Sequence, residues 1–65
     1  MQVMINGAMQ DIEKSVLSEV LVELGYGKQA VAVELNGQIL AMDSYTSIVI
    51  TASDRLEIVT FVGGG

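Results

Sequence analysis

The chain has 65 residues, of which 51% are hydrophobic, and it carries a formal net charge of −5. A domain of this size hides only about 60% of the surface of its unfolded chain, so its core is small. The absence of cysteine and histidine excludes disulfides and removes the usual ligands of zinc and iron–sulfur clusters. The acidic balance disfavours nucleic acid as a partner and favours docking to a basic protein surface.

No segment of the sequence reads as a membrane span or an export signal. The apolar run at residues 39–42 is far shorter than the roughly 20 residues that cross a bilayer. The opening stretch MQVMING lacks the positive region and long apolar core of a signal peptide. Because the absence of cysteine also fits a reducing compartment, we expect a cytoplasmic protein with no membrane contact.

Two Asn-Gly pairs predict two β-hairpins. Asn6-Gly7 and Asn36-Gly37 each stand between strand-like stretches. These two residue types best tolerate the positive φ angles of a type I′ turn. The first turn should join two strands near the N-terminus, and the second should join residues 31–35 to residues 38–41.

A helix is expected between the hairpins, because apolar side chains recur there with helical spacing. These side chains are Val16, Leu17, Val20, Leu21 and Leu24. We expect the helix over residues 16–24, with Ser15 as its N-cap and Gly25 in a left-handed conformation after its last turn. Glu19 and Glu23 would then lie on the opposite, solvated face.

The last strand has the strongest strand signal in the chain. Residues 55–62 read RLEIVTFV, which is rich in β-branched and aromatic residues, and they follow a polar turn that ends at Asp54. Residues 43–53 before this strand are rich in Ser and Thr. We expect them to form a loop, with at most a turn of helix or a brief strand.

Alternation of side chains gives this strand two different faces. Leu56 and Ile58 are the natural choice for the core, against the helix. Val59 and Phe61 then lie on the far side of the sheet, where an apolar patch is more often an interaction surface than an accident. We predict that Val59 and Phe61 bind a partner; the alternative is that they pack under the loop at residues 43–53.

The predicted order of elements is strand, strand, helix, strand, strand, strand. If the first and last strands lie side by side, they pair in parallel at the centre of a mixed sheet, as in the β-grasp fold of ubiquitin. We therefore expect an α+β protein of the β-grasp class, with a mixed four- to five-stranded sheet packed on one main helix. Residues 1–62 should form this single domain, and residues 63–65 a flexible C-terminal glycine tail.

The folded body offers no group for a reaction of its own. Without Cys or His there is no thiol nucleophile, no imidazole base and no Ser-His-Asp triad. The spacing of the 8 acidic residues singles out no catalytic pair, and no glycine-rich loop marks a phosphate cradle. We expect no catalytic residue, no metal and no cofactor, so the protein is not predicted to be an enzyme.

One chemically distinctive group remains, the α-carboxylate of Gly65. It follows the strongest strand through Gly63 and Gly64. Because glycine has no Cβ, such a tail can thread a narrow channel, and its terminal carbonyl is unhindered to attack. The alternative is an incidental, disordered terminus. The position of the tail and the lack of any other site favour a tail that takes part in chemistry.

Several stretches match one known family: the opening strand into Asn6-Gly7, the helix start at residues 15–17, VAVELNG at residues 31–37 and DRLEIVTFVGGG at residues 54–65. Together they cover essentially the whole chain, and the chain resembles the ThiS sulfur carrier proteins of thiamine biosynthesis, a ubiquitin-like β-grasp family. A terminal Gly-Gly alone would be weak evidence. An acidic turn, a Glu-Ile-Val strand and a terminal glycine run in a chain of this length make the resemblance specific.

The resemblance implies a role for each residue of the tail. Gly65 would be the residue that is modified, and Gly64 and Gly63 would be the tail required for activation. A ThiF-like adenylyltransferase would join the Gly65 carboxylate to AMP from ATP. Sulfur from a cysteine desulfurase route would then replace AMP, and the resulting thiocarboxylate would donate sulfur to thiazole synthase, ThiG. The chain would act as a protein co-substrate.

Two alternatives stay open. The small subunit of molybdopterin synthase also ends in Gly-Gly, but that family is commonly longer and often has prolines before the tail, whereas this chain has no proline. A β-grasp interaction module would bind through Val59 and Phe61 and would carry an incidental tail. Deleting Gly65 separates the sulfur carriers from the interaction module, because a carrier would lose sulfur transfer and a module would keep partner binding.

Overall fold

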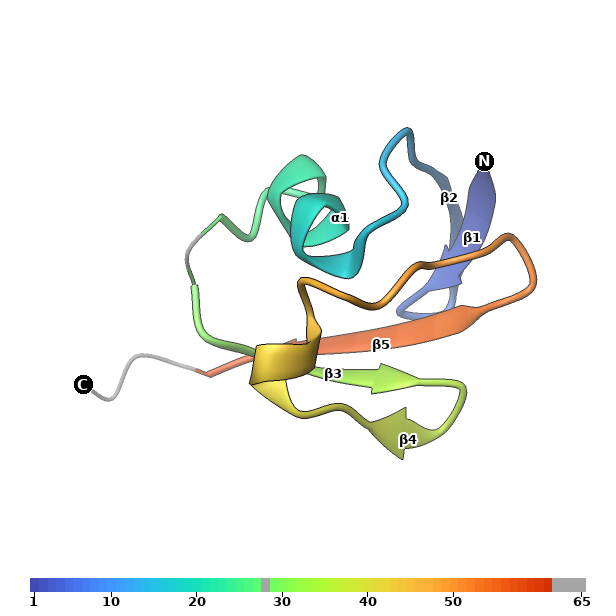
Figure 1. Ribbon diagram of the computed structural model, residues 1–65. Helices are drawn as coiled ribbons and strands as arrows, with labels where there is room; N and C mark the ends of the chain where they lie inside the picture. The colour runs from blue at the N-terminus through green and yellow to red at the C-terminus, as the bar shows by residue number, and fades with distance from the viewer. Residues whose placement is uncertain (28, 62–65) are drawn as a thin grey trace.

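The computed structural model describes residues 1–27 and 29–61, which form a mixed sheet and one α-helix (Figure 1). The elements in chain order are β1 (Gln2–Ile5), β2 (Ala8–Asp11), α1 (Leu17–Glu23), β3 (Val31–Leu35), β4 (Gln38–Ile39), the 3-10 turn η1 (Met42–Ser44) and β5 (Arg55–Thr60). The strands follow the order β2-β1-β5-β3-β4 in a five-stranded sheet. The predicted element order is confirmed.

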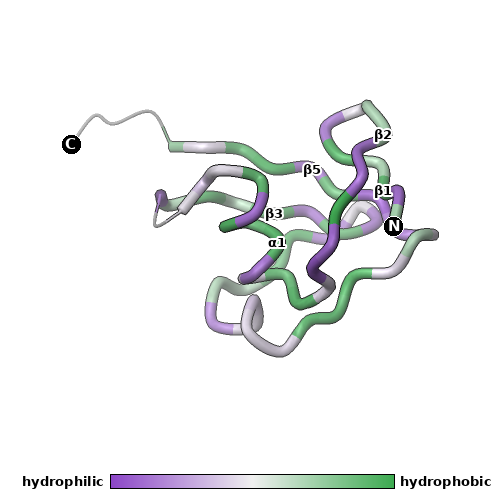
Figure 2. The backbone as a smooth tube through the Cα atoms, turned by 90° about the horizontal axis from the view of Figure 1, so that it is seen from above, coloured by the Kyte–Doolittle hydropathy of each residue, from purple (hydrophilic) through white to green (hydrophobic). Residues whose placement is uncertain are grey.

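The first and last strands pair in parallel, as predicted. Ile5 of β1 lies opposite Leu56 of β5. On its other side β5 pairs antiparallel with β3 over five register positions, from Val31 opposite Thr60 to Leu35 opposite Leu56. Figure 2 shows that the β1–β2 hairpin flanks only the beginning of β5, which continues beyond it toward the C-terminus. This is the topology of a β-grasp domain.

The core lies between one face of the sheet and α1, and the connection between β4 and β5 closes it. Leu56 is 0% and Ile58 is 6% exposed, which confirms their predicted place in the core. The other buried apolar side chains are Val3, Ile5, Ile12, Leu17, Val20, Leu21, Val31, Val33, Tyr45 and Ile50. Because β5 is the central strand, its inward side chains contact the core from the middle of the sheet.

Both Asn-Gly pairs form the predicted turns. The φ angles are 52° at Asn6 and 82° at Gly7, and 53° at Asn36 and 88° at Gly37. Positive φ at both central residues is the signature of a type I′ turn. The dipeptides therefore set both hairpin registers, which place Ile5 opposite Ala8 and Leu35 opposite Gln38.

The two asparagine side chains also connect their turns to β5. Asn6 Oδ1 accepts the backbone N–H of Ile58 at 2.7 Å in a partly buried position, and the Asn6 N–H donates to the Leu56 carbonyl at 2.9 Å. Asn6 thus continues the ladder beyond the end of β1. Asn36 Oδ1 accepts the backbone N–H of Arg55 at 2.9 Å, but this bond is exposed to water.

Replacing each asparagine by glycine should show how much its side-chain hydrogen bonding contributes to stability. Glycine keeps the positive φ of either turn, so the two variants differ mainly in the side-chain hydrogen bonds that are lost. Asn6→Gly loses the partly buried bond to Ile58, and Asn36→Gly loses two exposed bonds, to Arg55 and Asp54. We expect Asn6→Gly to lower the free energy of unfolding by about 1–3 kcal/mol, because it leaves the partly buried N–H of Ile58 unpaired. Asn36→Gly should cost less, because water can replace its exposed acceptor. Urea unfolding of both variants measures the difference, and equal losses would contradict it.

The start of α1 differs from the prediction. The N-cap is Val16, with φ −72° and ψ 130°, and no side chain caps it, so the prediction of Ser15 was wrong. Instead, the Leu17 N–H donates to the Ile48 carbonyl at 2.8 Å and the Ser18 N–H donates to the Tyr45 carbonyl at 3.0 Å. The first amides of α1 are therefore satisfied by the chain segment before β5, which a local sequence pattern does not reveal.

The end of α1 confirms the prediction for Gly25. Its φ is 95°, and its N–H donates to the Val22 carbonyl at 3.0 Å. The Tyr26 N–H donates to the Leu21 carbonyl at 3.0 Å. These two bonds make a Schellman motif, in which the residue after the helix adopts the left-handed conformation that glycine tolerates best.

Two strands are shorter than predicted. β4 covers Gln38–Ile39 instead of residues 38–41, and β5 ends at Thr60 instead of residue 62. The segment at residues 43–53 is a loop, as predicted. It includes the end of η1, and its Val49 forms an isolated bridge with Val16. Among the described residues, no helix is long and apolar enough to cross a membrane.

Candidate functional site

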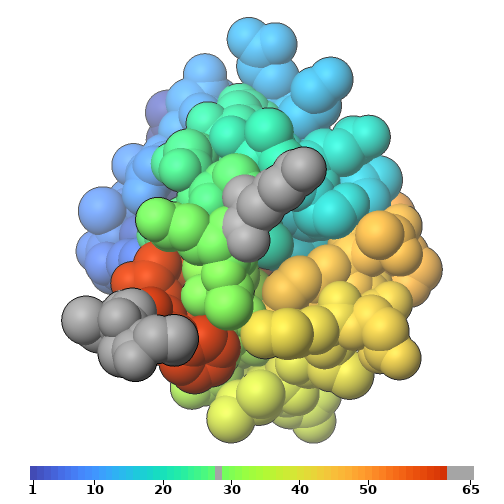
Figure 3. All heavy atoms as spheres, turned by 90° about the vertical axis from the view of Figure 1, so that its left-hand side faces the viewer, coloured from blue at the N-terminus to red at the C-terminus, as the bar shows by residue number. Residues whose placement is uncertain are grey.

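The predicted chemical site lies just beyond the end of β5. Gly63, Gly64 and Gly65 are outside the described residues. The last described contact is the bond from the Phe61 N–H to the Ala30 carbonyl, at 3.4 Å. Figure 3 views the molecule from this side and shows the end of β5 at the surface, next to the segment that leads into β3. The described part of the chain therefore ends at the molecular surface.

Val59 and Phe61 are exposed, as the sequence predicts. Their side chains are 59% and 58% exposed, and Val59 lies on the sheet face opposite α1. The alternative, in which they pack under the loop at residues 43–53, is wrong. That loop lies on the other face of the sheet, where its Ile50 side chain is buried in the core. Partner binding by Val59 and Phe61 stays a prediction.

We call the sheet face opposite α1 the outer face. The register places Ala32 opposite Val59, and Glu34 opposite both Glu57 and Ile39. Ile39 is 77% exposed. A hollow of about 200 Å³ is lined by Ala32, Val33, Glu34, Ile39, Glu57 and Val59. Sequence reasoning missed Ile39, although the Asn36-Gly37 turn fixes the register that brings it to this face.

A larger hollow, of about 640 Å³, lies beside α1, away from the end of β5. It is lined by Glu13, Lys14, Ser18, Glu19, Val22 and Glu23. Among the described residues, no three His, Cys, Asp or Glu side chains are placed to hold a metal ion. The residues that line this hollow form no catalytic combination that we recognise. Its size alone does not make it the functional site.

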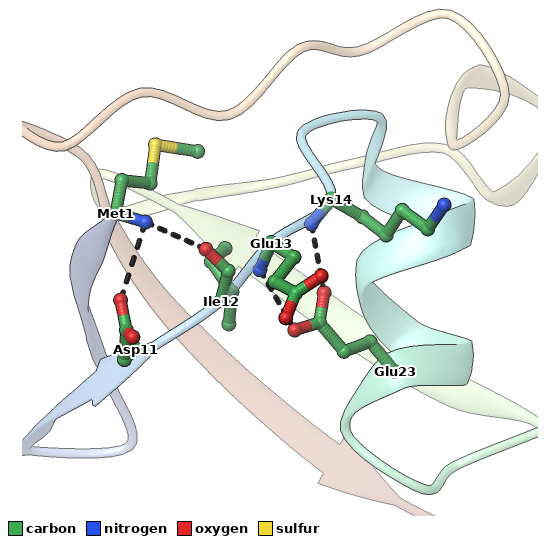
Figure 4. A network of polar contacts seen from close by, with 6 residues as sticks. All are labelled: Met1, Asp11, Ile12, Glu13, Lys14 and Glu23. Carbon is green, nitrogen blue, oxygen red and sulfur yellow. Dashed lines mark hydrogen bonds and ion pairs between the residues drawn. The ribbon is translucent and has the colours of Figure 1, made fainter.

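Glu23, which lines this hollow, holds the connection between β2 and α1 (Figure 4). Its two carboxylate oxygens accept the backbone N–H groups of Lys14 at 2.8 Å and Glu13 at 2.7 Å. These bonds lower the pKa of Glu23 below its ordinary value of 4.5. The prediction that Glu19 and Glu23 are exposed is confirmed, but it missed this structural role. In the same view the Met1 ammonium donates to the Ile12 carbonyl at 2.6 Å.

Asp54 is a turn residue, as predicted. Hydrogen bonds from the Asn36 side chain at 2.9 Å and from the Thr51 backbone N–H at 2.8 Å lower its pKa below the ordinary value of 3.8. Asp54 thereby connects the β3–β4 turn to the turn before β5. Three hydrogen bonds to its carboxylate therefore give Asp54 a structural role.

The lowered pKa values of Glu23 and Asp54 predict a loss of stability in acid. Because both carboxylates have a lower pKa in the folded than in the unfolded state, their bonds stabilise the fold above the ordinary values of 4.5 and 3.8. That contribution is lost as the pH falls through the folded-state pKa values. The midpoint of thermal unfolding should therefore fall below these values, and it should fall by less in Glu23→Gln. An equal fall in Glu23→Gln would contradict this role.

A mixed sheet with parallel first and last strands at its centre and one covering helix defines a ubiquitin-like β-grasp protein. The model of the ThiS family matches residues 3–65. The chain therefore belongs to the ThiS family of sulfur carriers of thiamine biosynthesis. This membership confirms the resemblance seen in the sequence.

A solved structure and two curated proteins agree with this assignment. The chain is 31% identical to the thiamine biosynthesis protein ThiS of Geobacter metallireducens, with a TM-score of 0.78 and 100% of both chains covered. It is 41% identical to a thiazole synthase of Paramagnetospirillum magneticum and 33% identical to one of Magnetococcus marinus, over 100% of this chain. The chain spans only 20% of the length of these two relatives.

Proposed function

We propose that this chain carries sulfur on the carboxyl group of Gly65, as a thiocarboxylate that is used to form a thiazole. The observation that carries the proposal is the family match, which extends to residue 65 and so includes the glycine tail. The chemistry available within the chain points the same way, because the sequence has no thiol and no imidazole with which to catalyse a reaction itself.

The proposed reaction begins at the Gly65 carboxylate. One carboxylate oxygen attacks the α-phosphorus of ATP and displaces pyrophosphate, which leaves a mixed anhydride with AMP. A persulfide sulfur from a cysteine desulfurase route then attacks the Gly65 carbonyl carbon, and AMP leaves with the anhydride oxygen. A thiol reductant next cleaves the S–S bond of the resulting acyl disulfide, which supplies the two electrons and releases the thiocarboxylate. Gly63 and Gly64 contribute a narrow segment without Cβ atoms, which can reach into the channel of a ThiF-like adenylyltransferase.

Val59 and Phe61 are proposed to dock this enzyme next to the tail. Both are more than half exposed, and Phe61 is the last described residue before the tail. Covering a side chain that is a little over half exposed contributes about 1–2 kcal/mol, which corresponds to a change in affinity of roughly five- to thirtyfold. The net charge of −5 further favours a basic enzyme surface, so the affinity should fall as salt is added.

Alanine variants test the docking role. Val59→Ala and Phe61→Ala should each raise the KM of the adenylyltransferase for the carrier by about tenfold, measured as carrier-dependent ATP–pyrophosphate exchange. The midpoint of thermal unfolding should stay nearly unchanged, because both side chains are exposed. Val22→Ala is the matched control, since Val22 is 64% exposed but lies on α1. An equal rise in KM for Val22→Ala would contradict a specific docking surface.

Thiazole synthase is the proposed acceptor of the sulfur. The two curated relatives named thiazole synthase contain a region similar to the whole of this chain. A carrier and its acceptor in one polypeptide would meet at high effective concentration. The proposed compartment is the cytoplasm, where ATP is available to the activating enzyme.

A further inference from the structure

Two glutamates face each other at the centre of the outer face. Glu34 of β3 lies directly opposite Glu57 of β5, and the odd-numbered positions of β5 point away from the core. Like charges at directly opposed positions of an antiparallel pair destabilise a sheet. Arg55 belongs to the same face, but the described residues form no ion pair with Glu34, Glu57 or Arg55. The repulsion is therefore left without a compensating cation among the described residues.

Apolar side chains surround this acidic pair. Ile39 lies opposite Glu34 on β4, and Val59 follows Glu57 on the same face of β5. Both side chains line the hollow of about 200 Å³, and the two glutamates line it as well. A partner that covers Ile39 and Val59 would remove water from the carboxylates. Since a desolvated pair of like charges is costly, a partner that supplies a positive charge at this position is favoured over one that does not.

We infer that Glu34 and Glu57 together receive one arginine side chain of the proposed acceptor, thiazole synthase. This inference rests on the proposed function. A guanidinium group fits better than an ammonium group, because its planar array of donors can bond two carboxylates at once. Binding would then convert an unfavourable pair in the free carrier into a favourable triad in the complex.

The pair lies close enough to the tail for a partner that holds the tail to cover the pair as well. Glu57 is four residues from Phe61, which corresponds to about 13 Å at a rise of roughly 3.3 Å per residue. A standard interface buries about 800 Å² on each partner, so one enzyme can hold the tail and cover Glu57 together. Thiazole synthase is the partner class that the comparisons supply, because two relatives of that name contain a region similar to this chain.

Neutral variants of the pair should change stability and affinity in opposite directions. Glu34→Gln and Glu57→Gln should each raise the midpoint of thermal unfolding of the free carrier by roughly 1–5 °C, because each removes the repulsion. Each should also weaken binding of the full carrier to thiazole synthase by about fivefold or more, measured by calorimetry. Glu19→Gln is the control for net charge, since Glu19 lies exposed on α1, and it should leave the dissociation constant within about twofold.

Three results would overturn the inference. The first is an unchanged dissociation constant for Glu57→Gln, and the second is a lower unfolding midpoint for both variants. The third is a loss in Glu57→Gln that affects only adenylation and not binding to thiazole synthase, which would assign the surface to the activating enzyme. Failure of the proposed function is distinguishable, because it would appear as wild-type carrier that forms no thiocarboxylate at all.

Discussion

Deleting Gly65 should abolish sulfur loading and leave the folded domain unchanged. The deletion withdraws the terminal carboxylate by one residue, about 3.5 Å, from the position where it meets ATP. Because a misplacement of about 1 Å can cost 100-fold in rate, we expect thiocarboxylate formation to fall by at least that factor. The measurement is the intact mass of the carrier after incubation with the activating enzyme, ATP and a sulfur donor.

Competition provides the control for this deletion. The shortened carrier keeps Val59 and Phe61, so it should inhibit loading of the wild-type carrier with an inhibition constant close to the wild-type KM. Its thermal unfolding should match that of the wild type, because the deleted residue lies beyond β5. Efficient thiocarboxylate formation at Gly64 in the shortened chain would show that the length of the tail is not critical.

Leu56→Ala should have the largest effect on stability. Leu56 is 0% exposed and lies in the central strand, where β1 and β3 both pair with it. Removing a buried leucine side chain costs about 2–5 kcal/mol. A domain of 65 residues has only about 3–10 kcal/mol of stability in total, so this loss is a large fraction of it and the unfolding midpoint should fall accordingly. Urea unfolding followed by circular dichroism measures the loss.

Val59→Ala is the matched control on the same strand. Val59 is 59% exposed, so its truncation should change the free energy of unfolding by no more than about 0.5 kcal/mol. The two variants thus distinguish the inner and outer faces of β5. Leu56→Ala should lower the free energy of unfolding, and Val59→Ala should weaken docking. Similar losses of stability in both would contradict the assignment of these faces.

The features that local chemistry controls could be predicted from the sequence. Asn6-Gly7 and Asn36-Gly37 predicted both hairpins, because few other residue pairs tolerate positive φ at consecutive positions. Gly25 predicted the end of α1 for the same reason. The alternation in β5 predicted which side chains are buried, because a strand places successive residues on opposite faces.

The features that failed depend on contacts between distant segments. Ser15 looked like an N-cap, but the first amides of α1 bond to the carbonyls of Tyr45 and Ile48. Glu23 looked merely solvated, yet its carboxylate binds the backbone of the preceding connection. Neither contact follows from residue spacing, because each requires the chain to return to α1 in three dimensions.

The candidate site was predicted in part. Exposure of Val59 and Phe61 followed from strand alternation, whereas the facing of Glu34 and Glu57 required the register between β3 and β5. The role of the tail came from its family resemblance, which the match over residues 3–65 now supports. Glycines carry no side chains, so no pattern of polarity or periodicity could have assigned a reaction to them.

The most direct test of the carrier role is the intact mass of the protein, recorded after co-expression with a ThiF-like adenylyltransferase and a cysteine desulfurase. We predict a species in which one oxygen is replaced by sulfur, and fragmentation should assign this change to Gly65. The species should disappear when the adenylyltransferase is omitted. Finding only the unmodified carboxylate, with the enzymes, ATP and a sulfur source all present, would contradict the proposal that this chain carries sulfur on its C-terminal glycine.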